Sequence, residues 1–72
     1  MNQTLLSGLI AKKGISKKHI AETMNIDRTT LYSKLNGDVD FKAKEIKMLY
    51  EILDMTPREL LLIFFGIKGG KI

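Results

Sequence analysis

The chain has 72 residues, a formal net charge of +4 and 44% hydrophobic residues, which suits one small domain with a compact core and excludes a disordered chain. It has no cysteine, which excludes disulfides and cysteine-ligated zinc. Its longest apolar run, Leu60 to Phe65, is too short to span a bilayer, and no basic-then-apolar leader is visible at the amino terminus. We therefore expect a cytoplasmic protein with no membrane partner.

The apolar spacing is helical along almost the whole chain. Leu5, Leu6, Leu9 and Ile10 form one face of a first helix, which Gly14 closes. No stretch alternates polar and apolar residues for long enough to indicate a strand. The sequence therefore predicts an all-α fold, with five helices in total.

Two short helices follow, which we expect at about residues 16–24 and 27–36. Ser16 and Asp27 stand at their starts, where a side-chain oxygen can cap backbone N–H groups. Asn25 tolerates a left-handed backbone, so a tight turn there sets the two helices at a steep angle. Each of three helix starts also has apolar residues spaced as a hydrophobic staple: Ile15 with Ile20, Ile26 with Leu31, and Met55 with Leu60.

Two more helices complete the plan. Gly37 ends the 27–36 helix as a left-handed cap. The start of the fourth helix is ambiguous, because Lys42 is a poor cap and Asp40 is the alternative. The last helix has a clear start, in which Thr56 is the cap, Pro57 follows and Glu59 completes a capping box.

The domain is expected to span residues 1–66, followed by a flexible tail at 67–72 that is rich in glycine and lysine. The run LLLIFF in the last helix is either core or interface. Because a helical bundle buries only a stripe of each helix, some of these side chains are expected to stay exposed unless another chain covers them. Phe64 and Phe65 are therefore candidates for a partner interface.

A helix, a tight turn and a short second helix with polar outward residues are typical of a helix-turn-helix. Arg28 can form a bidentate contact with guanine, and Thr29, Thr30 and Ser33 can bond to bases or phosphates. Lys17 can position a phosphate. The spacing alone is equally compatible with a solvated face of a small bundle, and Tyr32 suits a half-buried packing role as well as a contact.

The segment GISKKHIAETMNIDRTTLYSKLNG, residues 14–37, resembles the Cro- and lambda-repressor-type helix-turn-helix family, also called the XRE family. This resemblance implies a five-helix lambda-repressor-like domain that binds double-stranded operator DNA, and it makes a homodimer a candidate assembly. Carried over by position, it implies base contacts from Arg28, Thr29, Tyr32 and Ser33. It implies phosphate contacts from Lys17 and Asn36.

The segments LYSKLNGDVDF and KEIKMLYEILDMTPRELLLIFF look like small Cro-like regulators of temperate phages, which implies a transcriptional regulator in a bacterial host cell. The chain also resembles a modulator of repression, an antirepressor-like partner of a cognate phage repressor. Residues 16–40 contain four cations and four anions, which is unlike a basic DNA-binding stripe. The candidates for a protein interface are Asp27, Tyr32, Asp38, Asp40, Phe64 and Phe65.

The sequence gives no sign of an enzyme. His19 is the single histidine, and without an oriented partner or a cysteine nucleophile it is better explained as a solvated residue. The acidic residues are scattered and do not form a metal set, and the glycines near the carboxyl end do not follow a strand. We therefore expect no metal and no cofactor.

Overall fold

The computed structural model describes residues 1–66, and within them the chain forms five helices and no strand. The helices are α1 (Gln3–Lys13), α2 (Lys17–Met24), α3 (Arg28–Leu35), α4 (Ala43–Ile52) and α5 (Pro57–Phe65). The predicted all-α fold is confirmed. The predicted tail at 67–72 lies outside the described residues.

The helix starts are set by side-chain caps. Ser16 Oγ accepts a hydrogen bond from the His19 N–H at 3.0 Å, as the sequence predicts. Thr56 and Glu59 form the predicted capping box, with bonds of 3.1 and 2.8 Å. Asn2, which we did not predict, caps α1 by accepting from the Leu5 N–H at 3.0 Å.

The structure corrects one predicted cap and decides between the two alternatives for another. Asp27 holds the N-cap position of α3, but its side chain makes no capping hydrogen bond, and its carboxylate is exposed. The N-cap of α4 is Lys42 and not Asp40. Lysine has no acceptor, so Glu45 stabilises this start by accepting from the Lys42 N–H at 2.8 Å.

All five helices in residues 1–66 end in a left-handed residue, and the ends of α2, α3 and α4 share one pattern of turn. Asn25, with φ 57°, allows the Ile26 N–H to reach back to the Ala21 carbonyl at 3.0 Å, so α2 stops and α3 starts within a few residues. Gly37, with φ 86°, ends α3 in the same way. Asp54, with φ 49°, does so after α4. The predicted turns at Asn25 and Gly37 are confirmed.

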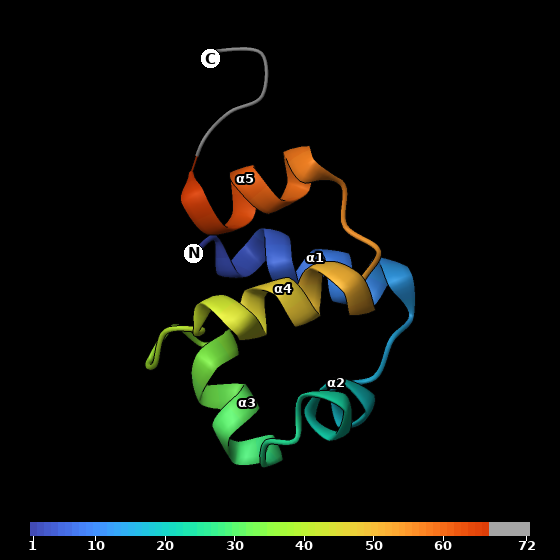
Figure 1. Cartoon of the computed structure of the whole chain (residues 1–72), viewed down its shortest axis with the longest axis vertical. Helices are drawn as coiled ribbons and strands as arrows, with labels where there is room; N and C mark the ends of the chain where they lie inside the picture. Colours follow the sequence, from blue (N-terminus) through green and yellow to red (C-terminus); the bar gives the residue numbers. More distant parts are fainter. Residues whose placement is uncertain (67–72) are drawn as a thin grey trace.

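One core holds the helices together, and Figure 1 shows how they are arranged around it. Helix α2 packs on both α3 and α4, while α1 packs on α3 and α5. In the figure, α5 lies at one end of the molecule and the α2–α3 pair at the other, with α1 and α4 between them. The buried apolar residues are Leu6, Leu9, Ile10, Ile20, Ala21, Met24, Leu31, Leu35, Leu49, Leu53, Met55 and Ile63.

Two hydrogen bonds from the amino-terminal segment join distant parts of the chain. The Asn2 N–H donates to the Ile63 carbonyl at 2.7 Å, which fixes the start of α1 against α5. Gln3 Nε2 donates to the Asn36 carbonyl at 2.6 Å, which fixes α1 against the end of α3. The position of α3 is therefore held at its carboxyl end by a bond outside the α2–α3 pair.

None of the helices in residues 1–66 has the length and apolar character needed to cross a membrane.

Candidate nucleic-acid interface

The α2–α3 pair is a rigid platform because its inner faces are buried. Ile20 and Leu31 are fully buried, and Ala21, whose carbonyl accepts from the Ile26 N–H in the turn between the helices, has 3% of its surface exposed. A small side chain at this point lets the two helices approach closely. The outer face of α3 is thus held at a fixed angle to α2 and presented to solvent.

Three of the four predicted base-contacting residues lie on this outer face. Arg28, Thr29 and Tyr32 are exposed, and Arg28 is the first residue of α3. Ser33 is half-buried, which leaves its hydroxyl less accessible than the others. The structure therefore groups the guanidinium of Arg28, the hydroxyl of Thr29 and the phenol of Tyr32 within the first five residues of α3.

Lys17 and Tyr32 come together across the two helices. Lys17 is the first residue of α2, and its Nζ lies 5.3 Å from the centroid of the Tyr32 ring. This is a cation–π contact between a predicted phosphate contact and a predicted base contact. Neither residue is buried, and Tyr32 has 44% of its surface exposed.

Asn36 lies apart from this group. It is the C-cap of α3, and its side chain is exposed. An eight-residue helix rises about 12 Å, so Asn36 is roughly that distance from Arg28 along the helix axis. The predicted phosphate contacts Lys17 and Asn36 consequently flank α3 at different places.

Sequence reasoning missed the role of Lys34. This lysine lies on the inner face of α3, and its Nζ is 2.5 Å from Glu45 Oε1 of α4, with both side chains almost fully buried. Burial raises the pKa of Glu45, but the hydrogen bonds from Lys34 and from the Lys42 N–H, together with the charge of Lys34, hold that pKa below its ordinary value.

The burial of Lys34 changes the charge of the candidate interface. In residues 16–40 the four cations are balanced by four acids, but the charge of Lys34 is neutralised by Glu45. The exposed cations that remain are Lys17, Lys18 and Arg28, and the exposed acids are Glu22, Asp27, Asp38 and Asp40. Three minus four gives an exposed charge of −1, so this surface attracts phosphates less than the formal count suggests.

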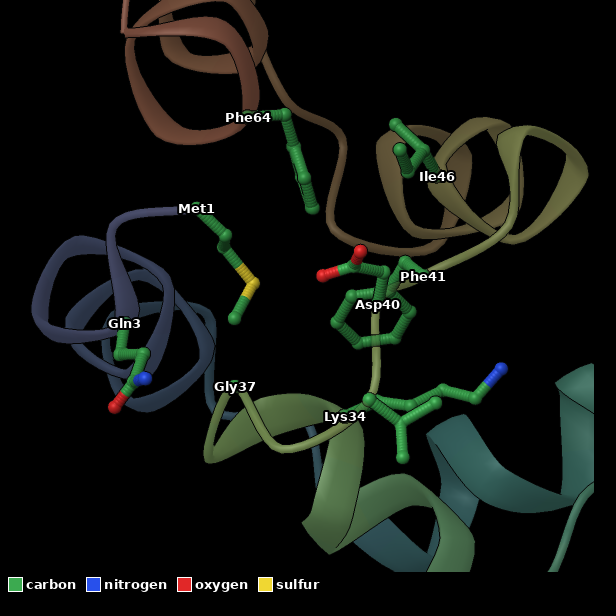
Figure 2. Close-up of a pocket in the computed structure, with 9 residues that line it drawn as sticks. Met1, Gln3, Lys34, Gly37, Asp40, Phe41, Ile46 and Phe64 are labelled. Atoms are coloured by element: carbon green, nitrogen blue, oxygen red, sulfur yellow. The ribbon is translucent and has the colours of Figure 1, made fainter.

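The six candidates for a protein interface fall on separate surfaces. Asp27 and Tyr32 belong to the α2–α3 surface. Asp40 and Phe64 line one pocket of about 410 Å³ between the amino terminus, the α3–α4 loop and α5. Figure 2 shows the Asp40 carboxylate directed into this pocket, near Met1 and Phe64.

The aromatic residues near this pocket differ in exposure. The Phe64 ring packs edge-to-face on Phe41, with the centroids 6.0 Å apart and the planes at 83°. Phe65 has 59% of its surface exposed. The expectation that part of the LLLIFF run stays exposed is thus confirmed for Phe65, while Ile63 of the same run is buried core.

His19 is exposed on α2. Across residues 1–66 no three His, Asp or Glu side chains are grouped closely enough to hold a metal ion.

Two helices with buried inner faces, joined by a tight turn and with polar exposed residues on the second helix, define a helix-turn-helix domain. The family model of the Cro/C1-type helix-turn-helix DNA-binding domain matches residues 6–64, and the chain belongs to this family. Its members are DNA-binding domains of transcriptional regulators and are not generally enzymes. No curated protein and no solved structure matches the chain significantly.

Proposed function

We propose that the protein is a phage-type transcriptional regulator that binds operator DNA through α2 and α3 and acts in a switch between lysogeny and lytic growth. It would act in the cytoplasm of a bacterial host cell. The observation that carries the proposal is the exposed group of Arg28, Thr29 and Tyr32 on a platform whose inner face is fully packed. Membership in the Cro/C1-type family supports DNA as the partner.

The arrangement suits the major groove of DNA. Arg28 begins α3, so its guanidinium extends from the end of the helix that a helix-turn-helix directs at the bases. Arginine can donate two parallel hydrogen bonds to guanine, and a threonine methyl can contact thymine. We assign sequence reading to Arg28, Thr29, Tyr32 and Ser33, and phosphate contacts to Lys17 and Asn36.

Selection of duplexes from a randomised pool tests this function directly. The expected result is enrichment of a short sequence that the protein binds more tightly than a scrambled duplex of the same composition. Enrichment of no sequence at moderate salt would refute operator binding by the protein alone.

A second function is favoured by the charge of the surface. The exposed charge of −1 over residues 16–40, with Asp27 free of a capping bond, suits a basic protein surface better than it suits phosphates. The protein would then be a modulator of repression, which covers the DNA-reading surface of its cognate phage repressor. Co-purification with that repressor tests this function, and a complex that forms without DNA is the expected result.

Self-association is a further part of the proposal. Phe65 and Leu5 are exposed, and an apolar groove between α1 and α5 is lined by Leu5, Leu9, Leu62 and Ile63. One side of this groove is α5, which lies at the end of the molecule opposite α2 and α3 (Figure 1), so a homodimer formed there leaves both α3 helices free. Sedimentation should show dimers at micromolar concentration for the wild type and monomers for Leu5→Ser with Phe65→Ser.

A further inference from the structure

The contact between Lys17 and Tyr32 gives Lys17 a role besides phosphate binding. The Lys17 ammonium lies over the Tyr32 ring, 5.3 Å from its centroid, although fifteen residues separate the two in the sequence. Lys17 belongs to α2 and Tyr32 to α3. The contact therefore depends on how α2 and α3 are packed, and it lies on the surface that the proposed function uses.

The two backbones in this contact are firmly held. The hydrogen bond from the His19 N–H to Ser16 Oγ fixes the first turn of α2, where Lys17 lies. Tyr32 follows Leu31, which is fully buried. With both backbones fixed, only the side-chain torsions of Lys17 and Tyr32 can change. The cation–π contact couples these torsions.

The contact restricts an otherwise mobile side chain. An exposed tyrosine on a helix samples more than one rotamer, and a cation over one face favours the rotamer that makes the contact. For exposed pairs this preference amounts to about two- to five-fold in population. The face that Lys17 covers is closed to stacking, so the opposite face, the ring edge and the hydroxyl are what Tyr32 presents to a partner.

We propose that Lys17 is a positioning residue for Tyr32, and that the pair sets sequence preference together. This inference rests on the proposed DNA-binding function. A positioning role and a phosphate contact predict different effects of removing Lys17. Removing a phosphate contact weakens binding evenly across sequences, whereas removing a positioning residue also reduces the preference of the protein for its best sequence.

The first test measures the contact itself in the free protein. In NMR spectra, the ring current of Tyr32 should shift the ε-methylene protons of Lys17 upfield. Tyr32→Phe should keep this shift because the ring remains, and Tyr32→Leu should abolish it. A Lys17 methylene shift that is the same in wild type and Tyr32→Leu would overturn the inference without any DNA experiment.

The second test compares binding to the duplex enriched by the wild type with binding to its scrambled form. Lys17→Met keeps the aliphatic stem and removes the charge, and we expect it to lower the preference between the two duplexes about two- to five-fold. Lys17→Arg should retain the preference. Lys18→Met is the matched control, since Lys18 is also exposed on α2 and is not in the Tyr32 contact. It should weaken binding to both duplexes by the same factor.

A combined variant shows whether the two residues act as one unit. Lys17→Met with Tyr32→Leu should lose no more preference than Tyr32→Leu alone, because Lys17 acts through the ring. If Lys17→Met weakens binding to both duplexes by the same factor, as Lys18→Met does, then Lys17 is a phosphate contact only and the inference is wrong. If the wild type enriches no duplex, the proposed function fails at that earlier step, and the inference fails with it.

Discussion

Lys34 of the predicted recognition helix forms a buried ion pair with Glu45 of α4, at 2.5 Å between Nζ and Oε1. The pair joins the helix that faces the proposed DNA partner to a helix outside the helix-turn-helix. It also neutralises one of the four cations of residues 16–40. The same contact thus fixes the position of α3 and makes its surface less attractive to phosphates.

Loss of one member of this pair should destabilise the fold strongly. Lys34→Met leaves the Glu45 carboxylate buried without its partner, and we expect a loss of about 3–5 kcal/mol in the free energy of unfolding. Lys34→Met with Glu45→Gln should recover much of that loss, because no charge remains buried and the amide oxygen can still accept from the Lys42 N–H. Urea unfolding of the three proteins measures this. A double variant less stable than Lys34→Met would contradict the explanation.

The pH dependence of stability should report the same carboxylate. The pKa of Glu45 in the folded protein lies below its ordinary value of 4.5, so the folded state holds this proton less tightly than the unfolded state does. The stabilisation is therefore fully present above about pH 5 and is lost as the pH falls through the folded pKa. Glu45→Gln should flatten the acid limb of the stability profile. Thermal unfolding from about pH 6 down to about pH 3 gives the comparison, and identical acid limbs would exclude Glu45 as the cause.

Much of the fold follows from local signals in the sequence. Ser16, Thr56 and Glu59 cap helices as predicted, since each acts on backbone N–H groups only a few residues away. Asn25 and Gly37 adopt the left-handed backbone that their residue types favour. The sequence leaves the start of α4 open between Lys42 and Asp40. It is at Lys42, because Glu45 there bonds back to the N-cap backbone while also pairing with Lys34, a contact from another helix.

The candidate site was less predictable for a related reason. Exposure of Arg28, Thr29 and Tyr32 follows from the position of the apolar stripe on α3, which Leu31 and Leu35 define. Lys34 lies on that same stripe, three residues after Leu31, and this spacing was the available signal that its charge is turned inward. Its partner Glu45 depends on how α3 and α4 pack, which local pattern does not reveal.

The salt dependence of DNA binding should be shallow. Each phosphate neutralised on duplex DNA contributes a slope of about −0.9 in a plot of log affinity against log salt concentration. Lys17, Lys18 and Arg28 are the exposed cations of the helix-turn-helix segment, so the slope should be no steeper than about −3 per bound chain. Titrations of the enriched duplex at several salt concentrations check this. A slope of about −6 per chain would mean that lysines outside this segment contact DNA.

Arg28 should carry base discrimination. Removing a bidentate contact with guanine costs about 1–3 kcal/mol at one base pair, so Arg28→Ala should relax the preference at a single position of the enriched sequence. Arg58→Ala is the matched control, because Arg58 is also exposed but lies at the start of α5. Competition with single-base variants of the duplex measures the preference. A loss of preference spread over all positions would assign Arg28 to the phosphates instead.

A charge reversal at Asp38 and Asp40 should separate the two proposed functions. Both residues are exposed and lie in the α3–α4 loop, where lysine can replace them without burying a charge. If the protein masks a basic repressor surface, replacing both with lysine turns attraction into repulsion. Each exposed pair contributes up to about 1 kcal/mol, and the change removes two pairs and adds repulsion, so we expect the repressor complex to weaken about ten-fold.

The same change should strengthen binding to random duplex DNA, since it adds four units of positive charge close to α3. Glu51→Lys, which alters an exposed acid near the far end of α4, is the control and should leave the repressor complex intact. Calorimetry with the purified repressor and fluorescence anisotropy with labelled random DNA give the two affinities. If the unaltered protein binds the enriched operator tightly and forms no repressor complex, the modulator function is wrong and the protein is a DNA-binding regulator alone.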